Sequence, residues 1–382
     1  MRLANSVTKF AVLLLSAFAL AILPAKAQDH SAVASSLQPF VENHTLAGAV
    51  TLVATKDRIL DLGAIGFADL ELMLPMHPDA LFLIASMTKP ITATALMMLI
   101  EEGKLKLDDP VEMYLPEFKS QMLVTETQDH MVLKKPARAI TVKDLLTHTS
   151  GLVSTSPLEG LNTLREEVLT YGLSPLHFPP GSKYEYNNPG IATAGRLIEV
   201  LAKMPYEWFL QKRLFAPLGM KDTTFFPNEG QLKRLAKPYK AGPGNKGLRE
   251  VHLDWLSDRN RPANPAGGLF STASDVAKFC QMILGNGEYQ GKRYLSDKSV
   301  RLMTTTQTGE LKKDEGPDSG YGLGWQTHKS PHPTFGHGGK YNTWMWIDPS
   351  KDLIFVLMVQ YDTFRGDIRT TFHETALKTF GK

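Results

Sequence analysis

The sequence predicts an α+β fold in which one antiparallel sheet is built from both ends of the chain, with a large helical region inserted between them. Stretches rich in apolar residues over 47–54 and 58–67 indicate two strands joined as a hairpin. Strand patterns return near the C-terminus, over 322–327, 341–347 and 353–360. Because an isolated two-stranded hairpin is only marginally stable, we expect the first strands to pair with the last ones.

Helical patterns fill most of the remaining chain. We expect a short helix over 33–43 and further helices over 86–102, 191–202, 274–284 and 368–380. The two terminal helices, 33–43 and 368–380, are expected to flank the sheet. Thr141 and Asp144 form a capping-box pattern at the start of another helix, which ends before the loop His148-Thr149-Ser150-Gly151.

The composition excludes several classes of function. With 42 basic and 39 acidic residues, a formal net charge of +3 over 382 residues lacks the strong positive charge of a nucleic-acid-binding protein. The single cysteine, Cys280, cannot form an internal disulfide or a zinc site built on thiolates. Hydrophobic residues make up 43% of the chain, which is enough for a sizeable core and excludes general disorder.

The first 27 residues are typical of a signal peptide. Two basic residues precede an apolar run over 10–23, and Ala25 and Ala27 fit the small-residue rule for cleavage. The run is too short to span a hydrocarbon core of roughly 30 Å, and no later stretch is long enough either. We therefore predict cleavage near Ala27-Gln28 and a periplasmic or secreted protein without a membrane span. Residues 28–382 then form one domain. Its sheet part covers about 30–85 and 315–382, and its helical part covers about 86–314.

One motif that could carry chemistry is Ser86-Met-Thr-Lys89. Pro90 lacks an N–H and belongs in a first helical turn, which puts Ser86 at a helix N-terminus and Lys89 on the same face. A buried lysine can have its pKa lowered enough to take the proton of a serine hydroxyl. Alone, however, the motif is better explained by a helix-capping serine followed by a solvated lysine.

Two later segments change that interpretation. The turn-rich loop over 179–190 carries Tyr186-Asn187-Asn188, directly ahead of an apolar helix. The segment Phe335-Gly-His337-Gly338-Gly339-Lys340 is a glycine-rich lead into a strand, where missing side chains let a substrate lie against the backbone. The chain thus carries S-x-x-K, Y-x-N and H-x-G motifs in this order.

With these motifs the chain resembles the serine β-lactamase and penicillin-binding-protein superfamily. It is most similar to the branch of class C β-lactamases, family VIII carboxylesterases, D-stereospecific aminopeptidases and R61-type D,D-peptidases. The resemblance covers essentially all of residues 28–382 and includes three further segments, 145–152, 267–275 and 321–325. It implies a β-lactamase-like fold and a serine hydrolase.

The resemblance also implies roles for individual residues. Ser86 would attack a carbonyl to form an acyl-enzyme, and Lys89 and Tyr186 would share the proton transfers, with Tyr186 as a base if the ammonium of Lys89 stabilises its anion. Asn188 would orient Lys89 and the substrate. The backbone N–H groups of Ser86 and Lys340 would form the oxyanion hole.

His337, Gly338 and Gly339 would line the opposite wall of the substrate site. No metal or organic cofactor is implied, and the partner is a small-molecule ester, amide or peptide. Class C β-lactamases carry lysine and threonine where this chain has His337 and Gly338. An imidazole is mostly neutral at pH 7, which argues against efficient β-lactam hydrolysis.

Three functions follow from the sequence. The first is an exported, esterase-like serine hydrolase that cleaves a small ester or amide through acyl-Ser86. The second is a D-stereospecific peptidase or D,D-carboxypeptidase on peptidoglycan-type peptides, or a weak β-lactamase. The third is a non-catalytic binding protein on the same fold. Cys280, on an apolar helical pattern, and His148 are interpreted as structural.

Overall fold

The structure is a computed structural model that describes residues 31–126, 130–156, 158, 160–312 and 316–381. The predicted signal peptide, residues 1–27, lies outside the described residues and stays a prediction. Within the part of the chain that the structure describes, no helix is both long enough and apolar enough to cross a membrane.

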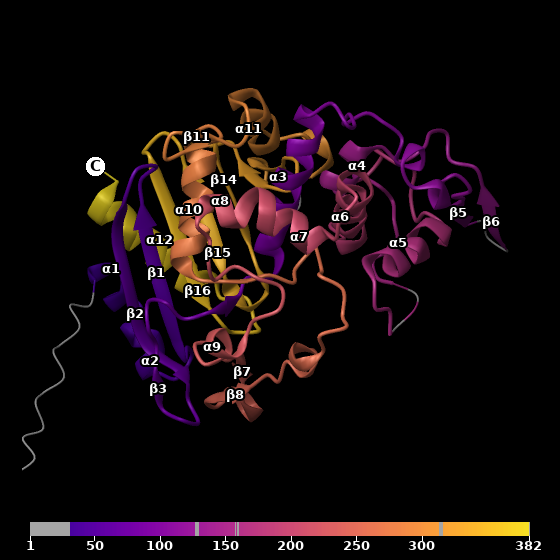
Figure 1. Cartoon of the computed structure of the whole chain (residues 1–382). Coiled ribbons are helices and arrows are strands. Elements are labelled where there is room, and N and C mark those ends of the chain that lie inside the picture. Colours follow the sequence, from indigo (N-terminus) through magenta and orange to yellow (C-terminus); the bar gives the residue numbers. More distant parts are fainter. Residues whose placement is uncertain (1–30, 127–129, 157, 159, 313–315, 382) are drawn as a thin grey trace, which may run out of the picture.

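One antiparallel sheet combines the two ends of the chain (Figure 1). Within the described residues it has eight strands in the order β12-β13-β14-β15-β16-β1-β2-β3. The strands are β1 (Gly48–Ala54), β2 (Ile59–Asp69), β3 (Leu74–Pro75), β12 (Ser319–Tyr321), β13 (Gln326–His328), β14 (Thr334–Gly338), β15 (Trp344–Asp348) and β16 (Leu353–Val359). Because β1 pairs with β2 on one side and with β16 on the other, the predicted fold class is confirmed.

Helices cover both faces of this sheet. On one face lie α1 (Ala32–Ser35), α2 (Gln38–Glu42) and α12 (Gly366–Phe380), and on the other α3 (Thr88–Glu101) and α10 (Ala273–Leu284). Along β1, Ala49 and Val53 pack toward the terminal helices, whereas Val50 and Leu52 pack toward the main core. A strand buried on both faces is apolar at nearly every position, which explains the long apolar run that predicted β1.

The helical part contains α4 (Val142–Leu146), α5 (Leu164–Leu173), α6 (Asn188–Ala202), α7 (Tyr206–Leu210), α8 (Ala216–Leu218), α9 (Glu229–Leu232) and α11 (Asp297–Thr304). Outside the large sheet, the described residues form short strand pairs: β4 (Phe82–Leu83) with β9 (Phe270–Ser271), β5 (Leu123–Glu126) with β6 (Met131–Lys134), β7 (Tyr239–Ala241) with β8 (Leu248–Glu250), and β10 (Glu288–Tyr289) with β11 (Lys292–Arg293).

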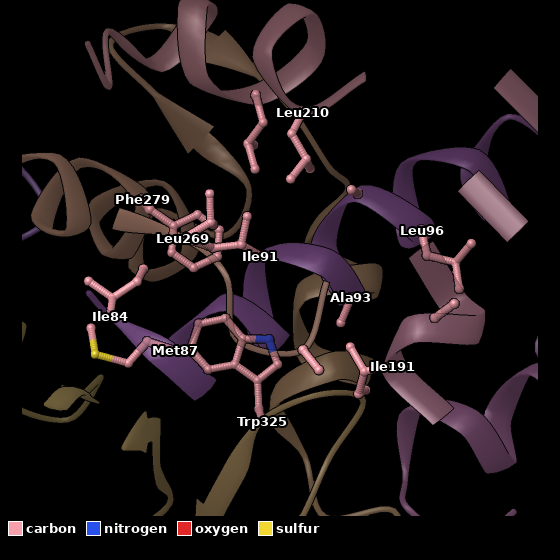
Figure 2. Packing of buried hydrophobic residues seen from close by; sticks show 14 of the residues in the cluster. Ile84, Met87, Ile91, Ala93, Leu96, Ile191, Leu210, Leu269, Phe279 and Trp325 are labelled. Atoms are coloured by element: carbon pink, nitrogen blue, oxygen red, sulfur yellow. The ribbon is translucent and has the colours of Figure 1, made fainter. Parts of the chain in front are cut away.

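Helix α3 runs between the sheet and the helical part and is buried from Thr88 to Leu99. Figure 2 shows its residues Ile91, Ala93 and Leu96 among side chains of neighbouring elements, including Phe279 of α10 and Ile191 of α6. A helix enclosed on all sides cannot shift without disturbing the core. The first turn of α3 is therefore a rigid platform.

Three expectations about secondary structure were wrong in detail. The strand predicted over 322–327 is a hairpin: β12 ends at Tyr321, β13 begins at Gln326, and Gly324 has a φ of +78°. A Cβ at Gly324 would lie 2.6 Å from the Cβ of Ala93, so the turn packs directly on α3. The apolar residues of this turn are buried in the core. In the sequence, a buried turn shows the same run of apolar residues as a buried strand.

The other two differences also arise from local turns. The helix predicted over 33–43 is split into α1 and α2, because the second helix starts afresh with Pro39 in its first turn. The strand predicted over 341–347 begins later, at Trp344, since Tyr341 and Asn342 both have positive φ angles. The segment before it is itself a strand, β14, up to Gly338.

The capping box predicted at Thr141 is confirmed. Asp144 Oδ2 accepts hydrogen bonds from Thr141 N at 2.8 Å and from Arg138 Nη1 at 2.5 Å. Asp144 Oδ1 accepts from Arg138 Nη2 at 2.9 Å and from Thr149 Oγ1 at 3.0 Å. One buried carboxylate thus ties the start of α4 to the His148 loop that follows it.

We expect Asp144→Ala to lower the free energy of unfolding by roughly 2 kcal/mol at pH 7, since it removes a helix cap and an ion pair. Burial alone would raise the pKa of Asp144, but hydrogen bonds from Arg138 and Thr141 outweigh it and hold the pKa below its ordinary value. A carboxylate with a lowered pKa stabilises the folded state above its unfolded pKa, and this stabilisation is lost as the pH falls.

Chemical denaturation at pH 7 and pH 3 checks this expectation. The stability difference between the wild type and Asp144→Ala should shrink at pH 3. Asp57→Ala is the control, because Asp57 is 73% exposed and its ion pair with Lys56 lies on the surface. A difference that is equal at both pH values would contradict the role given to the ionised carboxylate.

Candidate active site

Ser86 lies in a single 3₁₀ turn, Ala85–Met87, directly before α3. Ala85 has a φ of +46°, which is rare for a residue with a Cβ. Ser86 is partly exposed, whereas Ala85 and Met87 on either side are buried. Pro90 lies in the first turn of α3, as the sequence predicted. The chain thus presents the serine at the N-terminus of a rigid helix.

The side chain of Lys89 is fully buried, and none of its hydrogen-bond partners among the described residues is a carboxylate. Its Nζ lies 3.1 Å from Ser86 Oγ, 2.8 Å from Asn188 Oδ1 and 2.6 Å from the carbonyl oxygen of Ala266. Burial lowers the pKa of Lys89 to about 7. When the amine is neutral, its two N–H groups can still donate to Asn188 Oδ1 and to the Ala266 carbonyl, while its lone pair faces Ser86 Oγ.

Tyr186 lies next to Lys89, whose Nζ is 4.8 Å from the centroid of the Tyr186 ring. The side chain of Ser86 lies near the phenol. Although 40% of the residue is exposed, burial of the phenol raises the pKa of Tyr186 above its ordinary value of about 10, and the nearby Ser86 side chain only partly offsets this. Tyr186 is therefore protonated at neutral pH.

Asn188 is the first residue of α6, and the side chain of Asn187 caps this helix by accepting from Gly190 N at 3.0 Å. The cap fixes the helix start, which leaves the neighbouring Asn188 side chain directed at Lys89. The geometry is the one that an orienting role for Asn188 requires.

The third motif brings the end of β14 against the segment that precedes Ser86. A Cβ at Gly339 would lie 2.3 Å from the carbonyl oxygen of Ile84, so only glycine allows this approach. Gly338 and Gly339 are partly exposed, and Lys340 is exposed, with its Nζ 3.3 Å from Asp362. The backbone after β14 therefore lies beside the backbone of the serine turn.

His337 was expected to line the wall of the substrate site, but its side chain is buried. Only 1% of it is exposed, and both ring nitrogens are engaged: Nδ1 lies 2.6 Å from the carbonyl oxygen of Gly338 and Nε2 lies 2.9 Å from the hydroxyl of Tyr321. Burial, with the nearby charge of Lys89, lowers the pKa of His337 to about 3. A neutral ring must donate from Nδ1 and accept at Nε2. Both ring nitrogens are therefore hydrogen-bonded within the protein and do not face a substrate.

The structure thus brings Ser86, Lys89, Tyr186 and Asn188 together and places Gly339 beside them. Sequence reasoning missed the carbonyl of Ala266, which directly precedes one of the segments that carried the resemblance, 267–275. Cys280 is fully buried, which raises the pKa of its thiol, in agreement with a structural residue.

Comparisons with known proteins show the family of the chain. The Beta-lactamase family model matches residues 33–378. Protein Rv1367c of Mycobacterium tuberculosis is 33% identical over 357 residues, covering 86% of this chain and 89% of that protein. Esterase EstB of Burkholderia gladioli is 32% identical over 310 residues, covering 72% of this chain and 74% of that protein.

The fold is also shared with solved structures. EstCE1, described as a hydrolase with promiscuous acyltransferase activity, has a TM-score of 0.78 over 90% of this chain and 97% of that chain, at 23% identity. Such a likeness shows the fold. Taken with the family match over residues 33–378, it means that the chain belongs to the Beta-lactamase family of serine hydrolases.

Proposed function

We propose that this protein is an exported, esterase-like serine hydrolase that cleaves small esters through an acyl-Ser86 intermediate. The observation that carries the proposal is the buried amine of Lys89, 3.1 Å from Ser86 Oγ, with a pKa of about 7. An amine that is partly neutral at neutral pH can act as a general base there. The export rests on residues 1–27, which are outside the described part of the chain.

In acylation, neutral Lys89 takes the proton of Ser86 as Oγ attacks the ester carbonyl. The oxyanion of the tetrahedral intermediate accepts hydrogen bonds from the backbone N–H groups of Ser86 and Lys340. When the intermediate collapses, the bond to the alcohol oxygen breaks and Tyr186 protonates that oxygen. This gives Tyr186 the role of acid, because its raised pKa keeps it protonated, and gives Lys89 the role of base.

In deacylation, the Tyr186 phenolate takes a proton from water as the water oxygen attacks the acyl carbon. The bond to Ser86 Oγ then breaks, and the ammonium of Lys89 returns its proton to Oγ. The cycle consumes one ester and one water, releases an acid and an alcohol, and restores both side chains.

Two observations favour an ester over the alternatives. Esterase EstB is among the relatives that match most of this chain. In addition, His337 is neutral, so position 337 supplies no cation for the carboxylate of a β-lactam. We therefore expect p-nitrophenyl butyrate to be cleaved faster than a D-alanyl peptide or penicillin.

Intact-mass measurement tests the nucleophile. The wild type should gain one adduct with a fluorophosphonate, and Ser86→Ala should gain none and should lose roughly 10⁴-fold or more in kcat/KM for p-nitrophenyl butyrate. Ser182→Ala is the control, since Ser182 is exposed and its hydroxyl donates to Pro179 O. An unlabelled wild type, or a labelled Ser86→Ala, would show that Ser86 is not the nucleophile.

The pH dependence tests the base. The kcat/KM for the ester should rise with pH through about 7 and then level off, since Lys89 must lose its proton before it can accept one. Lys89→Arg should be inactive across pH 6–9, because a guanidinium stays charged. A rate that is constant from pH 5 to 9 would contradict a base with this pKa.

Tyr186→Phe separates the two proton-transfer roles. We expect it to lower kcat about 10²-fold to 10⁴-fold, as loss of a general acid does, while the rise in kcat/KM stays near pH 7. The measurement is the pH profile of the variant with the same ester. If the rise near pH 7 disappears in Tyr186→Phe, the titrating group is Tyr186, and our assignment of acid and base is reversed.

A further inference from the structure

His148 lies in the loop after α4 and contacts the rings around Tyr186. It is fully buried, and its ring centroid is 4.4 Å from that of Tyr186, 4.7 Å from that of Tyr321 and 6.0 Å from that of Tyr184. No step of the proposed reaction uses it. From the sequence alone, His148 was interpreted as a structural residue. In the structure, however, its contacts converge on Tyr186 of the site.

His148 binds the backbone on both sides of Tyr186. Its carbonyl oxygen accepts from Glu185 N at 2.9 Å, and its Nδ1 accepts from Asn187 N at 3.3 Å. His148 has a φ of +57°, and in this left-handed conformation both its carbonyl and its ring meet the same loop. Two hydrogen bonds and a ring contact from a single residue therefore hold Tyr186.

The Nδ1 acceptor requires a neutral ring. Burial lowers the pKa of His148 well below its ordinary value, and positive charge on Lys89 acts in the same direction. The remaining proton is then on Nε2, which has no hydrogen-bond partner among the described residues. A buried, unpaired N–H costs stability, and a phenylalanine would fill the space without that cost. The acceptor at Nδ1 is the property that phenylalanine lacks.

We infer that His148 is a positioning residue for Tyr186: its neutral imidazole holds the backbone at Asn187 and the ring of Tyr186, and so sets where the phenol lies relative to Ser86 Oγ. The inference rests on the proposed function, in which that phenol protonates the leaving alcohol. A small displacement of a proton donor lowers the rate of a chemical step strongly while leaving substrate binding almost unchanged.

Two substitutions of His148 separate the contribution of its ring from that of its hydrogen-bond acceptor. His148→Phe keeps a ring but has no acceptor, whereas His148→Asn keeps an acceptor near the place of Nδ1 and tolerates a positive φ. With p-nitrophenyl butyrate we expect His148→Phe to lose about 10-fold to 100-fold in kcat with KM changed less than about threefold. His148→Asn should recover a large part of that loss.

His373→Phe is the matched control. This partly buried imidazole on α12 also packs against an aromatic ring, with its centroid 4.7 Å from that of Phe355, but it lies outside the site. Its kcat should equal that of the wild type. Melting temperatures of all variants show which of them fold. Should His148→Phe not fold, His148→Gln replaces it, because glutamine moves the acceptor away from the Nδ1 position.

A double-mutant cycle with Tyr186→Phe distinguishes positioning from general damage. If His148 acts through the phenol, His148→Phe should lower kcat far less in the Tyr186→Phe background than in the wild type. An equal loss in both backgrounds, or a His148→Asn no better than His148→Phe, overturns the inference and leaves the proposed function standing. A Tyr186→Phe variant with wild-type kcat overturns the acid assignment and the inference with it.

Discussion

The burial of one ammonium group, that of Lys89, determines how the site is built. Taking an amine out of water without a carboxylate partner strongly favours its neutral form, and only well-placed hydrogen-bond acceptors make such burial tolerable. The acceptors around Nζ come from three separate segments: the serine turn, the first residue of α6 and the carbonyl of Ala266. A carboxylate at any of these places would fix the lysine as a permanent cation.

The elements that carry these acceptors are themselves tied to α3. Thr92 Oγ1, one turn after Lys89, donates to the carbonyl of Pro265 at 2.7 Å and contacts the hydroxyl of Tyr206 at 2.6 Å. Thr88 Oγ1 accepts from Leu269 N at 3.3 Å. The segment that provides the Ala266 carbonyl is thus held at both ends by threonines of the same helix.

The sequence was sufficient where local chemistry decides the structure. Pro90 defines the start of α3, Thr141 and Asp144 define that of α4, and the apolar runs of β1 and β16 define the centre of the sheet. It was insufficient where distant residues decide. Gly324 forms a turn because Ala93 packs against it, and His337 is buried because Tyr321 and Gly338 use its nitrogens. The Ala266 carbonyl could not be found from side chains, since any residue supplies one.

The pairing of β1 with β16 joins Ala49 to Val359 and Ala54 to Ile354, residues about as far apart as the chain allows. Contacts so distant in sequence form slowly, because a very long loop must close before they yield any stabilisation. During synthesis from the N-terminus, β1 exists long before its partner, and one edge of the first hairpin has nothing to pair with. The order of the elements therefore means that the pairing at the centre of the sheet can form only after β16 has been made.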